Sequence, residues 1–312
     1  LDRYPDPMAS GNKTVIYAAL IGNGLISITK FVAAGITGSS AMMAEGIHSL
    51  VDTGNQGLLL FGIKKAQAPP DDRHPFGHGK EIYFWSFVVA ILIFALGSGV
   101  ALYEGVHRVM HPEPVTNPMV NYVVLILAML FEGVAWYLAY KEFRRFQGPR
   151  SLPAAVQASK DPTTFVVLFE DTAAMLGLMV AFVGLVLNQW LEMPIFDGIA
   201  TLCIGVILAL TAVWMAVRTK SLLIGESADP ELIADVRGRA AEVDAIVAVN
   251  EVLTLHMGPN FILLNVSVDF KDDVPAGDVE NAIERLTGEI RGAHEDVKRV
   301  FIEAERAGSE PA

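Results

Sequence analysis

Long apolar stretches alternate with short polar segments over the first two-thirds of the chain. Each stretch can supply the roughly 20 residues that a membrane-spanning helix requires. The six stretches cover residues 14–36, 39–63, 82–108, 118–140, 163–189 and 195–217. The pattern therefore predicts six transmembrane helices. Because residues 1–11 are polar and the first stretch is of full spanning length, we expect insertion to start from that helix and not from a cleavable signal peptide.

The pattern changes after residue 222. A short helical repeat is followed by two runs that favour strands, a second helical repeat and a last short strand. In the second run, alternate residues share one face: Ile262, Leu264, Val266, Val268 and Phe270. The sequence thus predicts a six-helix domain over residues 1–222. A small α+β domain follows over residues 223–312, with helices on one face of a three-stranded sheet.

Composition and charge fit this division. The 312 residues are 52% hydrophobic with a mean hydropathy of +0.42, which is too apolar for an ordinary soluble protein. Residues 225–312 hold 19 Asp and Glu against 8 Lys and Arg, a net charge of −11 out of −12 for the whole chain. So acidic a domain disfavours nucleic acid as a partner.

Basic residues are concentrated on one side of the predicted spans. The flanks before the first span, after the second and fourth, and after the sixth hold Arg3, Lys13, Lys64, Lys65, Arg73, Lys80, Lys141, Arg144, Arg145, Arg150, Lys160, Arg218 and Lys220. The opposite loops hold little more than Arg108. By the positive-inside rule, both termini and the acidic domain are expected in the cytoplasm.

The second span carries a stripe of polar residues, namely Glu45, His48, Asp52, Asn55 and Gln56. His48 and Asp52 are four residues apart and share a helix face. Ionisable groups at that depth usually mark a functional site, and imidazole with carboxylate suits a divalent first-row metal. The alternative is a polar seam that hydrogen-bonds to neighbouring helices; for Glu45 and Gln56, a gating or packing role stays open.

The fifth span carries the adjacent acids Glu170 and Asp171. Such acids are costly within a bilayer unless they face water, a partner or a cation. Because they point about 100° apart, one helix face cannot take both without bending. Asp171 is the stronger candidate ligand, and Glu170 is a candidate whose structural role stays open.

Outside the spans, the loop after the second span holds Asp71, His74 and His78, spaced so that they could close around a metal ion. The alternative is a solvated loop with two titrating histidines. Lys30 in the first span could reach the interface or pair with an acid. The remaining buried polar candidates include Glu132, Asp197 and Thr201. No motif typical of an enzyme occurs.

Four segments together resemble the cation diffusion facilitators. They are the run Gly38-Ser39-Ser40-Ala41-Met42-Met43-Ala44-Glu45-Gly46-Ile47-His48-Ser49-Leu50-Val51-Asp52, the loop His74-Pro75-Phe76-Gly77-His78-Gly79-Lys80, the turn His111-Pro112-Glu113-Pro114-Val115, and Pro194 to Asp197. The resemblance covers essentially the whole chain. It implies a homodimeric metal/proton antiporter that moves zinc or a similar divalent ion out of the cytoplasm, with a ferredoxin-like tail and no organic cofactor.

The resemblance also implies roles for individual residues. His48 and Asp52 match the two ligands of the second span, and Asp171 matches the second of two ligands in the fifth span. Asp71, His74 and His78 match a cytoplasmic loop site. The sequence departs from the family at Val167, where the first ligand of the fifth span is expected and where valine cannot bind metal. Either Glu170 substitutes, or water completes the shell, or this branch handles its ion differently.

The tail departs from the family as well. Histidines that build a metal pair in some relatives are replaced by Asn250 and Asn265.

From the resemblance and the candidate ligands of the spans, we expect a zinc exporter in the cell (inner) membrane, with iron(II), manganese, cobalt or cadmium as other cargo. The competing hypothesis is a non-transporting, metal-responsive regulator or partner subunit that has kept the fold. A channel is a third possibility, which a ligand set able to bind tightly disfavours.

Overall fold

The computed structural model describes residues 12–147 and 149–306, so the polar segment 1–11 lies outside the described part of the chain. Contacts within the chain group these residues into a helical unit and a sheet unit. The described residues of the helical unit fall within Leu1–Gly62, Trp85–Leu152 and Pro162–Arg218. Those of the sheet unit fall within Ile63–Phe84, Pro153–Asp161 and Thr219–Ala312.

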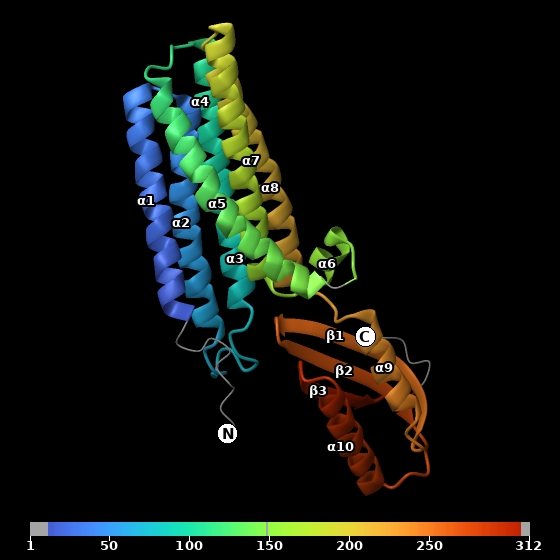
Figure 1. Ribbon diagram of the computed structural model, residues 1–312. Helices are drawn as coiled ribbons and strands as arrows, with labels where there is room; N and C mark the ends of the chain where they lie inside the picture. The colour runs from blue at the N-terminus through green and yellow to red at the C-terminus, as the bar shows by residue number, and fades with distance from the viewer. Residues whose placement is uncertain (1–11, 148, 307–312) are drawn as a thin grey trace. The chain divides into compact units, whose positions relative to one another are not determined.

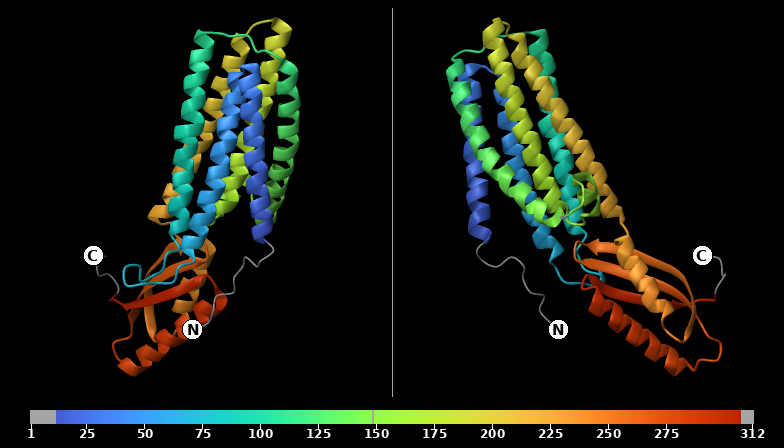
Figure 2. Two further views of the ribbon diagram at one scale, coloured as in Figure 1. Left: turned by 90° about the vertical axis from the view of Figure 1, so that its left-hand side faces the viewer. Right: turned by 45° about the vertical axis from the view of Figure 1, so that its right-hand side comes forward.

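Long helices make up nearly all of the helical unit, and Figures 1 and 2 show them running side by side. They are α1 (Asn12–Thr37), α2 (Ser40–Ala66), a rod of α3 (Glu81–Leu92), η1 (Ile93–Ser98) and α4 (Gly99–Met110), α5 (Pro118–Gln147), α7 (Pro162–Leu191) and α8 (Ile195–Ile224). The segment η1 is a π-helical stretch inside the rod. α5 packs mainly against α7 and α1.

Four of the described helices are long and apolar enough to cross a membrane: Glu81–Met110, Pro118–Arg144, Pro162–Leu191 and Ile195–Ile224. α1 and α2 coincide with the first two predicted spans but are not among these four. In α2, the stripe of polar side chains lowers the hydropathy. The chain is thus a membrane protein with several apolar helices, and the number of six spans is not confirmed.

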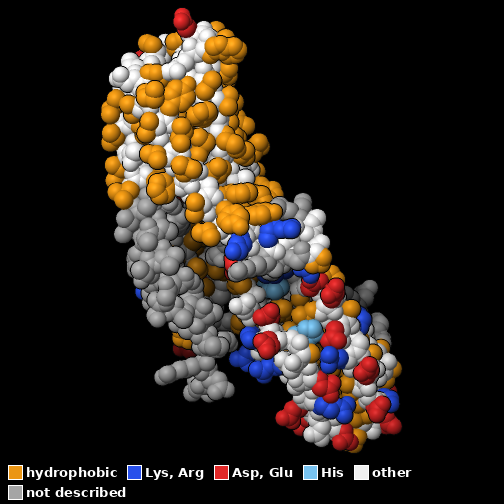
Figure 3. All heavy atoms as spheres, in the orientation of Figure 1, with side chains coloured by type: hydrophobic (Ala, Val, Ile, Leu, Met, Phe, Trp, Pro, Cys, Tyr) orange, Lys and Arg blue, Asp and Glu red, His pale blue; other side chains and the backbone are white. Residues whose placement is uncertain are grey.

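On the face drawn in Figure 3, the described side chains of the helical unit are mainly apolar, as their orange colour shows. On α5, Leu130 and Phe131 are each 63% exposed, and Val134 is 62% exposed. A soluble protein rarely leaves such a contiguous apolar surface in water. This surface is suited to contact with the hydrocarbon core of a membrane. The polar side chains gather on the buried side of the same helices.

Two glycines bring α4 and α8 into close contact. A Cβ atom added at Gly105 would lie 2.7 Å from the backbone nitrogen of Leu202, and one added at Gly198 would lie 2.8 Å from that of Val109. Small residues let membrane helices approach closely and gain packing energy without a hydrophobic driving force. These positions hold α4 and α8 together as a pair.

The sheet unit contains α9 (Pro230–Ala241), β1 (Ile246–Gly258), β2 (Phe261–Phe270), α10 (Ala276–Ala293) and β3 (Val297–Ala304). The sheet order is β1-β2-β3, with β1 antiparallel to β2 and β2 parallel to β3. This is the predicted order of helix, strand, strand, helix and strand. The same unit includes the loop before α3 and most of the short helix α6 (Leu152–Ala158).

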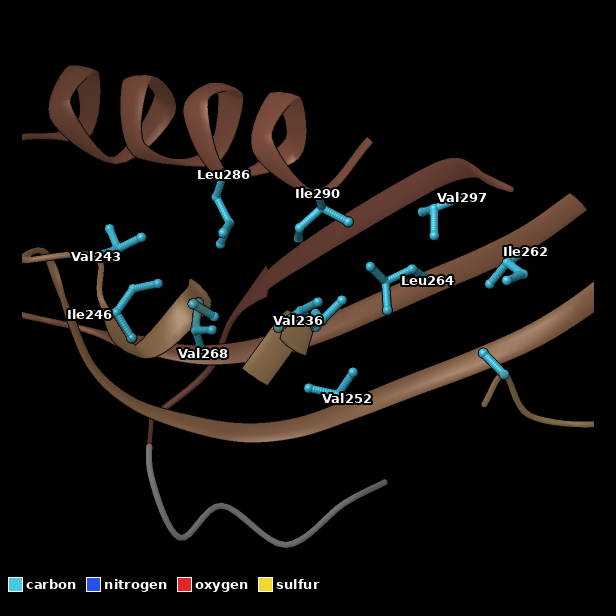
Figure 4. Close-up of a cluster of buried hydrophobic side chains, with 13 residues drawn as sticks. Val236, Val243, Ile246, Val252, Ile262, Leu264, Val268, Leu286, Ile290 and Val297 are labelled. Carbon is cyan, nitrogen blue, oxygen red and sulfur yellow. The ribbon is translucent and has the colours of Figure 1, made fainter. Parts of the chain in front are cut away.

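One hydrophobic core holds the sheet unit together, and Figure 4 shows its side chains converging. Leu264, Val266 and Val268 of β2 are fully buried, as their alternation predicts, while Phe270 is only partly buried. Val236 of α9 and Leu286 of α10 pack into this same cluster. Both helices therefore cover one face of the sheet.

Candidate metal centres

The polar stripe of α2 faces the interior of the helical unit. Glu45 and His48 are fully buried, and Asp52 and Asn55 are nearly so, while Gln56 is half-buried. Residues three, four and seven apart share one face of a helix, so the spacing of these residues places them together. The remaining faces of α2 carry apolar residues such as Leu50, which is exposed.

His48 and Asp52 are adjacent but do not satisfy each other. Nδ1 of His48 lies 3.2 Å from Oδ1 of Asp52. Even so, both ring nitrogens of His48 and Oδ1 of Asp52 are buried without a hydrogen-bond partner among the described residues. Buried polar atoms of folded proteins are nearly always paired. These orphaned atoms are those that a bound cation would use.

On α7, Glu170 is the acid that contacts α2. Nδ2 of Asn55 donates a hydrogen bond of 2.7 Å to Oε1 of Glu170, and the carboxyl groups of Glu170 and Asp52 interact directly. Asp171 is only half-buried, although it is near enough to Asp52 for their charges to interact. Val167, one turn before Asp171, is also half-buried. The structure thus brings Glu170 closer to the α2 pair than the sequence suggested.

The loop before α3 forms the tightest cluster of metal-ligating groups in the described part of the chain. One ligand atom from each of Asp71, His74 and His78 lies within 4.8 Å of the other two. Asp71 is the centre, because Oδ1 is 3.2 Å from Nδ1 of His74 and Oδ2 is 3.5 Å from Nε2 of His78. The four α2 and α7 candidates do not meet this criterion together.

Backbone hydrogen bonds shape this loop. Oδ1 of Asp71 accepts from the backbone N–H of His74 at 2.6 Å and of Arg73 at 2.9 Å. These bonds, that from His74 foremost, hold the pKa of the Asp71 carboxyl below its ordinary value. Gly77 has φ +84°, a left-handed conformation that suits glycine. The turn keeps Asp71 ionised and pointed at both histidines.

A cavity of about 310 Å³ adjoins this loop within the sheet unit. It is lined by His74, His78 and other loop residues, and by Leu223 and Met257. Gly79 abuts β1 so closely that a Cβ atom there would lie 2.4 Å from the carbonyl oxygen of Met257. No pattern in the sequence indicated this contact between the loop and β1.

Of the two roles predicted for Lys30, the structure shows the pairing with an acid. The side chain does not reach the interface. Its Nζ lies 3.1 Å from Oε2 of Glu45 and 2.7 Å from Oγ of Ser49, and the side chain is fully buried. Glu132 is also buried, and its charge acts on Glu45 and Asp52. The α2 stripe therefore lies in a wider cluster of ionisable groups.

Asp197 on α8 caps the start of α2. Its Oδ1 accepts from Oγ of Ser39 at 2.6 Å, and its Oδ2 accepts from the backbone N–H of Ser40 at 2.6 Å and from the Ser40 hydroxyl at 2.7 Å. Arg108 donates to the Gly38 carbonyl and to Glu113 close by. Sequence reasoning singled out Asp197 but missed the two serines. Paired serines before an apolar run are an N-cap signal.

Several known proteins similar to this chain are named for metal transport or metal tolerance. The family model described as the cation efflux transmembrane domain matches residues 16–224. The proton-coupled zinc antiporter SLC30A9, mitochondrial, of Homo sapiens is 32% identical over 262 residues, which cover 83% of this chain and 46% of the relative. Metal tolerance protein C4 of Arabidopsis thaliana is 28% identical over 303 residues, covering 96% and 64%.

A bacterial relative matches over nearly its whole length. The manganese efflux system protein MneP of Bacillus subtilis is 24% identical over 294 residues, covering 93% of this chain and 95% of the relative. By contrast, the chain spans about half the length of the SLC30A9 relatives that it matches.

Proposed function

The chain belongs to the cation efflux family, as the resemblance predicted, and from this premise we propose that it moves divalent metal ions across a membrane. Members of this family are transporters, so the chain is not an enzyme. Relatives named for zinc and for manganese share metal transport as their activity. The identity of the metal and the coupling to protons are further parts of the proposal.

The observation that carries this proposal is an excess of buried acidic over basic side chains among the described residues of the helical unit. The acids whose charges interact there are Glu45, Asp52, Glu132, Glu170 and Asp171. Among the described residues, Lys30 is the cation that acts on this group. Carboxylates removed from water are costly unless cations or protons neutralise them. A site of this composition is suited to exchanging a divalent cation for protons.

We assign His48, Asp52 and Asp171 as ligands of the transported ion, with Glu170 as a candidate fourth ligand. The unpaired atoms of His48 and Asp52 support the first two assignments. The hydrogen bond from Asn55 leaves Oε2 of Glu170 for an ion or for Asp52. Val167 supplies no donor, so water is the other source of a fourth ligand. One imidazole among carboxylates suits zinc while admitting harder ions such as manganese.

Competition between metal and protons supplies the coupling. A metal ion needs a neutral imidazole and ionised carboxylates, so protons displace it from the same atoms. A site open to the outside gains protons as it releases metal, and one open to the cytoplasm loses them as it loads. Tilting of a four-helix core against the α4 and α8 pair would alternate the access. The loop cluster of Asp71, His74 and His78 would act as a cytoplasmic entry or stabilising site.

The proposed topology has six spans, with α1 and α2 added to the four strongly apolar helices. Both termini and the domain over residues 223–312 lie in the cytoplasm, which the basic flanks support. That domain is ferredoxin-like in the proposal and helps to form a homodimer in the cell membrane. Its acidic character would raise the cation concentration nearby, within a Debye length of about 8 Å.

The second candidate function is a metal-responsive regulator or partner subunit that transports nothing. Val167 favours it, because a ligand position of the family carries valine here. The buried, unpaired atoms of His48 and Asp52 argue against it, since a decayed site would no longer need to keep them free of partners.

Reconstitution into liposomes separates the two functions. The full chain is incorporated into vesicles that contain a metal-sensitive dye, and zinc, manganese, iron(II), cobalt and cadmium are added in turn. A transporter gives dye signals above those of protein-free vesicles, with zinc among the best substrates. A protein that binds metal in detergent but gives no flux with any of the five metals is the regulator.

A further inference from the structure

We propose that Glu45 is an additional metal-binding residue, which receives the ion from the His48 and Asp52 site on its way out of the membrane. This inference rests on the proposed transport function and deepens it. Glu45 lies one turn before His48 on α2, toward the end of the helix that faces outward in the proposed topology.

The two carboxylate oxygens of Glu45 have different surroundings. Oε2 accepts from the ammonium of Lys30 at 3.1 Å. Oε1 is buried and has no hydrogen-bond partner among the described residues. A glutamate that served only to neutralise Lys30 would gain by pairing both oxygens, because an unsatisfied buried acceptor costs free energy. This buried, unpaired oxygen is therefore available to a transported cation.

Orphaned atoms form a file along α2. Oε1 of Glu45, both ring nitrogens of His48, Oδ1 of Asp52 and Oδ1 of Asn55 are all buried and unpartnered within the described structure. Their spacings of three, four and three residues keep them on one stripe, which extends over about 15 Å at 1.5 Å per residue. A polar seam that joined helices would satisfy these atoms. A path that replaces the hydration shell of an ion step by step would leave them available.

Gly177 on α7 makes room for the free oxygen. A Cβ atom added at Gly177 would lie 2.4 Å from Oε1 of Glu45, which is closer than van der Waals contact allows. Oε1 therefore lies in the interface of α2 and α7, where Glu170 also reaches α2. The proposed relay and the transport site belong to the same interface.

Lys30 acts as a positioning residue for this relay. Its Nζ donates to Oε2 of Glu45 and to Oγ of Ser49 at 2.7 Å, so the carboxylate is held through Oε2 while Oε1 lies against Gly177. The fixed positive charge also weakens the binding of a divalent cation to Glu45. An exit ligand must bind weakly enough to let the ion leave.

The test compares metal binding with metal flux for the full chain in three variants and in wild type. Glu45→Gln keeps the size and the contact with Lys30 but removes the charge. Gly177→Ala keeps the charge but places a methyl group against Oε1. Gly57→Ala, also on α2, is the matched control, because nothing lies within 4 Å of a Cβ atom there. Cadmium binding is measured in detergent, and cadmium and zinc fluxes are measured in liposomes.

We expect Glu45→Gln and Gly177→Ala to bind one cadmium ion in the helical unit, as wild type does. Their flux should fall by at least about tenfold, because the defect lies in a step after binding. Gly57→Ala should match wild type in both. Flux within about twofold of wild type in both Glu45→Gln and Gly177→Ala would overturn the relay. If Glu45→Gln does not fold, Gly177→Ala alone decides. Wild type and Gly57→Ala without any flux would instead overturn the proposed transport function.

Discussion

Asn55 of α2 and Glu170 of α7, 115 positions apart in the chain, are joined by a hydrogen bond of 2.7 Å. This bond turns Glu170 toward the stripe that carries His48 and Asp52. It also explains how an acid beside Asp171 can take part in the site, although the two point in different directions on their helix. In the proposed ligand set, Glu170 thereby supplies from α7 the fourth ligand that Val167 does not provide.

Asp52→Ala and Asp171→Ala should each abolish transport, because each removes a carboxylate ligand from the proposed ion-binding site. Both variants should remain folded. We expect flux to fall by at least about a hundredfold, which as a ratio of rates corresponds to about 2.7 kcal/mol of activation free energy. The measurement is zinc flux into liposomes, with size-exclusion profiles as the control for folding. His48→Ala should retain some flux with relaxed selectivity, since carboxylates can still hold a cation. Near-normal flux in Asp171→Ala would remove that residue from the ligand set.

Glu170→Ala should impair transport if Glu170 replaces the ligand that is missing at Val167. Val167→His should supply a second imidazole on the face of Asp171 and shift preference toward zinc and cadmium over manganese. In that background Glu170→Ala should matter much less. Competition assays in liposomes measure both effects. Wild-type flux in Glu170→Ala would mean that water completes the shell and that Glu170 only packs against Asn55.

His74→Ala combined with His78→Ala should lower the amount of bound metal and slow transport without stopping it. The loop site should also lose metal as the pH falls, because protons compete for the imidazole nitrogens. Asp71 should stay ionised during this titration, since its pKa is held below the ordinary value. Equilibrium dialysis with zinc over a range of pH values measures the loss. Complete loss of flux in the folded double variant would show that the loop site belongs to the transport path itself.

Lys30→Met should strongly destabilise the helical unit, because it leaves the carboxylate of Glu45 buried without its cation. Breaking one half of a buried ion pair costs about 3–5 kcal/mol. Adding Glu45→Gln to Lys30→Met should restore much of this loss. Thermal unfolding in detergent, followed by circular dichroism, compares the two. A single variant as stable as wild type would contradict the burial of this pair.

Patterns within one helix or strand were the ones that the sequence could reveal. The stripe of His48 and Asp52 follows from helical spacing, and the buried face of β2 follows from alternation. Contacts between elements far apart in the chain left no such trace. Asp197 and Ser40 are 157 positions apart in the chain, and their hydrogen bond depends on the packing of α2 against α8. Which of Glu170 and Asp171 faces α2 likewise depends on the rotation of α7 about its own axis. The sequence of a mainly apolar helix does not specify this rotation.

The exchange of metal for protons is tested by recording zinc and proton movements in the same liposomes. Vesicles are loaded with a zinc-sensitive and a pH-sensitive dye, and a pH gradient is imposed before zinc is added. We expect zinc entry to be accompanied by proton movement in the opposite direction. Reversing the pH gradient should slow zinc entry, and Asp52→Ala should abolish both signals. Zinc flux that is indifferent to the pH gradient, or that persists in Asp52→Ala, would contradict proton-coupled transport through this site.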